Sequence, residues 1–169
     1  MNSQDLKTAQ SQLAGVVPLE TLAAESGLSV MTGILEGRLP GASIAVALNF
    51  WLTRVEEGLI EFRGAPNEAH LNPLGTVHGG WAGTIMDSAL ACAVMTTLGI
   101  GEAYTTVEFK VNLVRPLMPN MGEVSCEGRI VHRGRTIATS EAFLRDASGK
   151  LLAHGTETCA IFPIAKLTR

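Results

Sequence analysis

An almost uncharged segment, NPLGTVHGGWAGTIMDSALACAVMTTLGIGE, occupies residues 72–102 of this 169-residue chain, and any fold must bury most of it. Before its last residue it holds one charged side chain, the carboxylate of Asp87. Residues 81–98, which follow Gly79 and Gly80, suit a single helix that is apolar on nearly every side. Other elements of the chain must therefore cover this helix.

The flanking sequence supplies the strands that such a helix requires. Residues 1–40 have the apolar spacing of short helices that end by Pro40. Apolar alternation and turn residues predict strands at 42–55, 59–64, 104–115, 122–133, 136–146 and 150–162. In 104–115, one predicted face is mainly apolar and the other is polar. The order predicts an α+β fold, with an antiparallel sheet of about six strands around the long helix.

Composition narrows the possible partners. Hydrophobic residues make up 46% of the chain and charged ones only 17%, so apolar surface is plentiful and a homo-oligomer is expected. Thirteen basic and sixteen acidic residues give a net charge of −3 without long runs, which disfavours nucleic-acid binding. Residues 79–101 are long enough to span a membrane, but their strand-like flanks argue against it. Three scattered cysteines and no visible secretory signal predict a cytoplasmic protein.

Asp87 requires a chemical explanation. On a helix it shares a face with Gly80, Gly83 and Thr84, whose small side chains leave a groove. An unpaired buried carboxylate costs several kcal/mol, so it must be hydrogen-bonded, protonated or used in chemistry. Burial raises a carboxyl pKa, which suits a general base or a nucleophile. The alternative is a structural hydrogen bond to Thr84 or Ser88.

The start of the same helix, His78-Gly79-Gly80, offers a second chemical feature. Its first backbone N–H groups lack intrahelical acceptors, and the helix dipole makes this end positive. Such an end can bind an oxyanion or polarise a carbonyl, so with the downstream acid it forms a candidate acyl-transfer site. His78 and Asp87 are about 13 Å apart along a helix, however, so one carbonyl cannot easily contact both in one chain. A symmetric dimer would solve this problem.

The ordered set Asn72-Pro73-x-Gly75-x-x-His78-Gly79-Gly80, followed by Asp87, resembles the hotdog-fold acyl-CoA thioesterases of the phenylacetic-acid-degradation type, in the 4-hydroxybenzoyl-CoA thioesterase superfamily. The resemblance extends over about residues 40–162, which suggests an N-terminal helical extension at 1–40 and a hotdog domain at 41–165. It implies hydrolysis of an acyl-CoA, without metal or cofactor, in dimers with shared active sites that usually pair into tetramers. It also includes Val114-Arg115-Pro116, Gly134-Arg135-Thr136 and Ala153-His154-Gly155-Thr156.

The resemblance also implies roles for individual residues. Asp87 would be the base or nucleophile, and the Gly79 N–H would polarise the thioester carbonyl. Asn72 would orient water or the thioester, and His78 would shape the helix start. Thr106 would assist the acid, with Thr105 as the adjacent alternative. His78 and Asn72 are equally well explained as structural residues of the loop.

The coenzyme A portion of the substrate needs cationic partners. Guanidinium groups suit phosphate oxygens, which makes Arg133 and Arg135, beside Thr136, candidates for this role. Arg115 and Lys150 are weaker candidates, and a solvated charged turn explains Arg133 or Arg135 equally well.

Several alternatives remain open. Within the same fold, a hydratase or dehydratase would act on similar thioesters, and a non-catalytic acyl-CoA sensor would bind them without turnover. No GxSxG elbow or metal-ligand spacing is present, and Cys92 in the apolar helix suits the core better than catalysis. The acyl group is undetermined, because a pocket with aromatic and long apolar side chains accepts both aromatic and medium-chain aliphatic groups. The candidate pocket residues are Trp81, Met86, Met31, Leu35 and Leu39.

Overall fold

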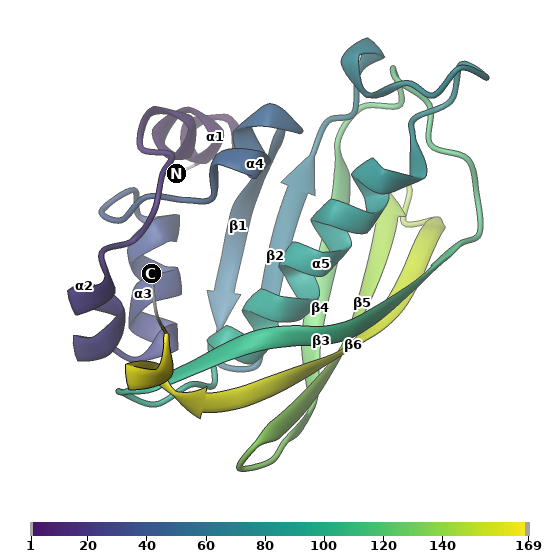
Figure 1. Ribbon diagram of the computed structural model, residues 1–169. Helices are drawn as coiled ribbons and strands as arrows, with labels where there is room; N and C mark the ends of the chain where they lie inside the picture. The colour runs from purple at the N-terminus through teal and green to yellow at the C-terminus, as the bar shows by residue number, and fades with distance from the viewer. Residues whose placement is uncertain (1, 168–169) are drawn as a thin grey trace.

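The structure, a computed structural model, describes residues 2–167 and consists of one six-stranded antiparallel sheet curved around a long helix (Figure 1). The strand order is β1-β2-β4-β5-β6-β3, so β1 and β3 form the two edges. This is the predicted α+β arrangement. The strands are β1 (Phe50–Glu56), β2 (Leu59–Gly64), β3 (Glu102–Leu113), β4 (Val124–Arg133), β5 (Ile137–Asp146) and β6 (Leu151–Pro163).

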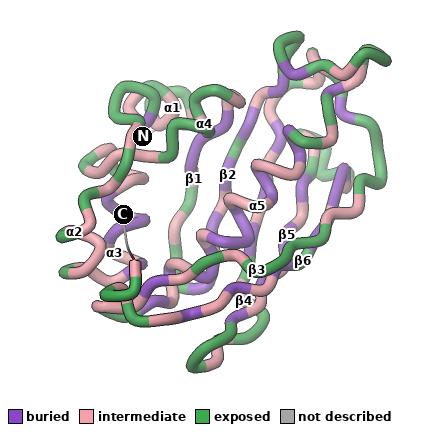
Figure 2. The backbone as a smooth tube through the Cα atoms, in the orientation of Figure 1, coloured by how far each residue is buried: buried purple, intermediate pink, exposed green. Residues whose placement is uncertain are grey.

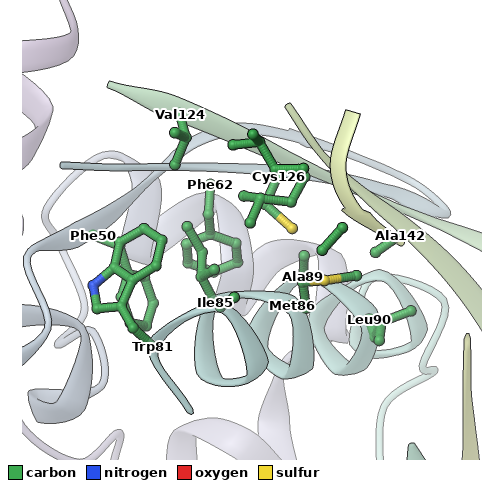
Figure 3. Packing of buried hydrophobic residues seen from close by; sticks show 14 of the residues in the cluster. Phe50, Phe62, Trp81, Ile85, Met86, Ala89, Leu90, Val124, Cys126 and Ala142 are labelled. Atoms are coloured by element: carbon green, nitrogen blue, oxygen red, sulfur yellow. The ribbon is translucent and has the colours of Figure 1, made fainter. Parts of the chain in front are cut away.

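The long helix, α5 (Gly79–Met95), lies against the concave face of the sheet and provides seven of the twenty buried residues of the main core (Figure 3). Fully burying a side chain such as Ile85 or Leu90 contributes roughly 1.5–3 kcal/mol. Within residues 2–167, no helix is both long and apolar enough to cross a membrane. The core side chains drawn in Figure 3 include Ile85, Met86, Ala89 and Leu90 of α5, Phe62 of β2, Cys126 of β4 and Ala142 of β5.

The backbones of α5 and the sheet lie very close together at Gly128 of β4. A Cβ atom at this position would lie 2.2 Å from the carbonyl oxygen of Ala89, well inside van der Waals contact. Because backbone meets backbone here, no side chain fits at residue 128 without moving α5 away from the sheet.

The N-terminal segment forms four short helices: α1 (Ser3–Gln12), α2 (Leu19–Ala24), α3 (Gly27–Leu35) and α4 (Ser43–Ala47). Helices α1, α3 and α4 pack on the β1 edge of the sheet, and α2 packs against α3. Gln10 fixes α1 to the edge, because its amide donates to the Leu52 carbonyl and accepts from the Leu52 N–H, both at 2.9 Å. Two single-turn 3₁₀ helices, η1 (Glu68–His70) and η2 (Ile164–Lys166), complete the elements. The predicted boundary after residue 40 stays a prediction.

The predicted strand at 42–55 is wrong in its first half. Residues 43–47 form α4, and β1 begins only at Phe50. Between them, Asn49 has a positive φ of 56°, and its side chain donates to the Ala65 carbonyl at 2.6 Å, so the chain reverses before it enters the sheet. A short apolar run does not distinguish one helical turn from a strand, and packing against β1 decides the outcome here.

The predicted faces of β3 also change. A bulge between Thr106 and Glu108 interrupts the alternation, and Val107, Phe109 and Leu113 are 61%, 45% and 53% exposed. Figure 2 shows the same exposure along much of β3. The apolar residues that sequence alternation assigned to one buried face therefore lie largely on the surface of a single chain.

Candidate active site

One strip of α5 remains accessible while the rest of the helix is buried. Its positions form two adjacent lines along the helix, 83 and 87 in one and 84, 88, 92 and 95 in the other, each with a spacing of three or four residues. Asp87 lies near the middle of this strip. The half-buried residues of the strip are Gly83, Thr84, Asp87, Ser88, Cys92 and Met95.

Asp87 is half-buried, and burial raises the pKa of its carboxyl group. The hydroxyls that might have satisfied it are engaged elsewhere, because Thr84 donates to the Gly80 carbonyl and Ser88 to the Thr84 carbonyl, each at 2.9 Å. Among residues 2–167, no hydrogen bond or ion pair holds the Asp87 carboxylate. The structural alternative for this acid is therefore wrong in its proposed form, and the carboxylate is available to another molecule.

The start of α5 is organised by His78. The Nδ1 of its ring accepts a hydrogen bond from the Gly80 N–H at 2.9 Å, and its backbone N–H donates to the His70 carbonyl at 2.8 Å. This contact assigns the N-cap role to His78 and uses the Gly80 donor, leaving the Gly79 N–H in the unpaired first turn. A Cβ at Gly79 would lie 2.9 Å from Leu113 Cδ1, so glycine allows β3 to pack closely at this end.

Asn72 organises the loop that precedes the helix. Its side-chain oxygen accepts from the N–H groups of Leu74 at 2.9 Å and Thr76 at 3.3 Å, while its amide donates to the Thr76 hydroxyl at 2.8 Å. These bonds make Asn72 a turn residue in the isolated chain. From Gly79 to Asp87 the helix rises by about 12 Å, so the structure does not bring the helix start and the acid together within one chain.

Thr106 is held by a residue that the sequence analysis did not identify. Its hydroxyl donates to Glu157 Oε1 at 2.7 Å, and the Cys159 thiol donates to the same oxygen at 3.0 Å. Glu157 is 1% exposed, and among the described residues its Oε2 has no hydrogen-bond partner. Thr105, the alternative to Thr106, is exposed.

Burial raises the pKa of Glu157 to about 7; the bonds from Thr106 and Cys159 oppose this shift, and the charge of Asp87 adds to it. The two acids are therefore close enough to influence each other electrostatically. Alternation in β6 was the available signal, because Glu157 shares its buried face with Gly155 and Cys159. On α5, burial raises the pKa of Cys92 to about 12, so its thiol is neutral and unsuited to nucleophilic attack.

The candidate coenzyme A residues do not form one cluster. Arg133 pairs with Glu102 at 2.6 Å, and its guanidinium also donates to the Gly134 carbonyl, so it joins the end of β4 to the start of β3. Arg135 and Thr136 are exposed in the same hairpin. Arg115 lies beyond the opposite end of β3, a strand of about 35 Å at the usual rise per residue. There it donates to the Leu151 carbonyl.

Residues 74–153 match the sequence model of the thioesterase superfamily. Acyl-coenzyme A thioesterase 13 of Mus musculus is 33% identical over 93 residues, which cover 54% of this chain and 64% of the mouse protein. The chain thus spans less than two thirds of the curated relatives that it matches.

Solved structures extend the likeness to the fold. A phenylacetic acid degradation-related protein of Ralstonia eutropha is 29% identical, with a TM-score of 0.71 over 78% of this chain and 98% of its own. A thioesterase-type protein of Streptococcus pneumoniae, solved with coenzyme A, is 20% identical and superposes with a TM-score of 0.62 over 68% of this chain and 87% of its own. At that identity the second likeness concerns the fold alone, and both agree with the hotdog arrangement expected from the sequence.

Proposed function

We propose that this chain, whose residues 74–153 match the thioesterase superfamily model, is a member of that superfamily and hydrolyses the thioester bond between an acyl group and coenzyme A. The observation that carries the proposal is Asp87, an acid of raised pKa on the accessible strip of α5 whose neighbouring hydroxyls are bonded elsewhere. Such a carboxylate suits proton removal near neutral pH. The similarity to acyl-coenzyme A thioesterase 13 of Mus musculus supports the substrate class.

In the proposed reaction, Asp87 removes a proton from a water molecule whose oxygen attacks the thioester carbonyl carbon. Negative charge develops on the carbonyl oxygen, where the Gly79 N–H and the positive end of α5 stabilise it. The C–S bond then breaks, and the departing sulfur accepts the proton that Asp87 holds. The products are a carboxylic acid and coenzyme A.

We infer that the helix start and the acid at one site come from two copies of the chain. Within one chain they are about 12 Å apart along α5. The free edge of β3 offers a surface for the second copy, because edge strands present unpaired backbone groups. Four apolar residues of β3 and the segment after it are exposed: Val107, Phe109, Leu113 and Val114. Pairing of such dimers into a tetramer stays a prediction.

We assign the binding of the coenzyme A phosphates to exposed cationic side chains. Arg135 and Thr136 lie near one end of β3, and Arg115 lies beyond the other end. Two copies paired along this edge would therefore supply these two groups of phosphate-binding residues from different chains. Arg133 is committed to Glu102 and is assigned the supporting role of holding the hairpin in place.

The first experiment measures free thiol release from phenylacetyl-, butyryl-, octanoyl- and lauroyl-CoA. We expect turnover by the wild type and a loss of at least about a hundredfold in Asp87→Asn, because a general base typically contributes that much or more. Asp146→Asn, at the end of β5 beside the turn to β6, is the matched control and should keep full activity. Binding without thiol release would favour the sensor, and addition of water across an enoyl-CoA would favour the hydratase.

A second experiment separates the base from the nucleophile. A single turnover in ¹⁸O-labelled water places the label in the acyl product if Asp87 activates water directly. Label in the Asp87 carboxylate would instead show a covalent acyl-aspartate intermediate that water opens by attack at the aspartyl carbonyl carbon. Mass spectrometry of the peptide that contains Asp87 distinguishes the two routes.

A further inference from the structure

A cavity of about 390 Å³ lies between the N-terminal helices and the central helix. Its walls come from the four N-terminal helices, from β1 and β2 and from α5, and its volume falls within the range of about 300–1,000 Å³ that is usual for small-molecule sites. Of these elements only α5 lies within the region that matches the thioesterase superfamily. Of the twenty-one lining residues, nine therefore come from the N-terminal extension at 1–40, nine from residues 41–62 and only three from α5.

The polar groups around the cavity are already satisfied by the protein. Gln10 exchanges two hydrogen bonds with the backbone of Leu52, and the Asn49 amide donates to the Ala65 carbonyl. The Ser88 hydroxyl donates within its own helix. These side chains hold the walls together, and the surface that remains for a ligand is mainly apolar.

The cavity wall contains one cation and no acid. The Lys7 ammonium lies 5.0 Å from the centre of the Trp51 ring, where a cation–π interaction occupies it. The neutral thiol of Cys92 adds an apolar sulfur to the α5 wall. Flexible methionines, Met31 and Met95, line the cavity with branched aliphatic residues, an adaptable surface for a hydrocarbon.

The cavity continues directly from the accessible strip of α5. Ser88, Cys92 and Met95 belong to both, and Asp87 precedes the first of them. From Ser88 to Met95 the helix rises by about 10 Å, so the α5 wall is longer than one aromatic ring. A thioester held at Asp87 thus has an apolar path for its acyl group along the helix and under α1.

We propose that this cavity binds the acyl chain of the substrate and selects an extended aliphatic chain. The inference rests on the proposed thioester hydrolysis and names its substrate class. A phenylacetyl ring would occupy the end near Ser88 and leave the apolar surface beneath α1 without contacts. A medium-length hydrocarbon chain would cover both ends, and each methylene removed from water adds favourable free energy.

Two variants of α4 test the cavity. Ala45→Phe places a large side chain at the cavity wall, whereas Ala47→Phe makes the same change on the same helix at an exposed position outside it. The measured quantity is the ratio of kcat/KM for lauroyl-CoA to that for butyryl-CoA. We expect a high ratio in the wild type and in Ala47→Phe, and a fall of about tenfold or more in Ala45→Phe.

Binding without chemistry makes the test independent of hydrolysis. S-dodecyl- and S-ethyl-coenzyme A are thioethers that cannot be hydrolysed, and calorimetric titration gives their affinities. Tighter binding of the dodecyl compound by the wild type, lost in Ala45→Phe and kept in Ala47→Phe, supports the cavity even if no thioester is turned over. In that case only the proposed hydrolysis fails.

The opposite pattern overturns the cavity proposal alone. Thioester hydrolysis with equal rates for short and long chains would leave the reaction standing and remove the chain-binding role. A clear preference for phenylacetyl-CoA over lauroyl-CoA would do the same, as would equal effects of the two α4 variants. Thermal unfolding of both variants verifies that each one folds.

Discussion

The two acids of raised pKa, Asp87 and Glu157, lie in contrasting surroundings. Asp87 is half-exposed on α5, burial alone raises its pKa, and its neighbouring hydroxyls bond to the helix backbone. Glu157 is buried between β3 and the core, where Thr106 and Cys159 hold one carboxyl oxygen. A protein gains nothing structural from a carboxylate without partners, whereas a held carboxyl group can order its neighbours. The difference supports the proposed catalytic role of Asp87 and suggests that Glu157 orders the residues around it.

The largest expected effect separates activity from stability at Asp87. Asp87→Asn should reduce thiol release by about a hundredfold or more, yet leave the free energy of unfolding unchanged or higher, because it removes an unpaired buried charge. In the wild type, activity should rise as pH rises through the raised pKa of Asp87, since only the ionised form accepts a proton. A large loss of stability in the variant would instead give Asp87 a structural role.

The next effect concerns the partner chain. Phe109→Glu places a charge on the exposed edge of β3 and should convert the protein to monomers with at least tenfold lower turnover, as measured by light scattering and thiol release. Ile100→Glu changes another exposed apolar residue, in the loop before β3, and is the control. The raised pKa of Glu157 makes stability depend on pH, and this dependence should persist in the monomers. Full activity in a monomer would contradict a shared site.

As pH rises, ionisation of Glu157 should lower the stability of the protein, whereas ionisation of a salt-bridged acid would raise it. Its pKa in the folded protein, about 7, lies above the ordinary value of 4.5, so the unfolded chain releases this proton first as pH rises. The free energy of unfolding should therefore fall between about pH 4.5 and 7, by at most about 3 kcal/mol.

Glu157→Gln tests this dependence, because the variant has no proton to lose. It should be more stable than the wild type at pH 8, by about 1–3 kcal/mol, with little difference at pH 4.5. Urea unfolding at both pH values measures the change. Glu141→Gln, on the neighbouring strand β5, is the control, and an unchanged pH slope in Glu157→Gln would disprove the assignment.

The smallest expected effect is the change in stability when the Thr106 hydroxyl is removed. Thr106→Val removes a donor to Glu157, which raises the pKa of this acid further and should lower stability at pH 8 by about 1 kcal/mol. Thr105→Val, at the exposed neighbouring position, should change stability by less than about 0.5 kcal/mol. Equal effects of the two substitutions would mean that the hydrogen bond from Thr106 to Glu157 does not contribute to the free energy of unfolding.

The sequence predicted the elements whose signal is local. A charge-free segment of helical length identified α5, and alternation between turn residues identified most of the strands. Residues 43–47 were misassigned because their form depends on packing against β1 and on the reversal at Asn49. The exposed side of β3 was missed because alternation shows that a strand has two faces, and a bulge then changes which face each residue occupies.

The same limit applies to the site. Asp87 was found because no charge surrounds it in the sequence. Glu157 was missed because a glutamate in an alternating strand usually faces water, and only the fold reveals that position 157 faces Thr106. The ion pair that engages Arg133 joins residues 31 positions apart, so local sequence gave no sign that this arginine was already paired.

The bonds from Gln10 to Leu52 have a consequence for the integrity of the chain. One side-chain amide pairs with both backbone groups of an edge residue, as a neighbouring strand would. Proteolytic removal of α1 would therefore uncover an unpaired strand edge beside an apolar hollow, the combination that recruits other chains into intermolecular sheets. We therefore expect α1 to protect the protein against aggregation, and a preparation clipped after it should precipitate while its sheet is still folded.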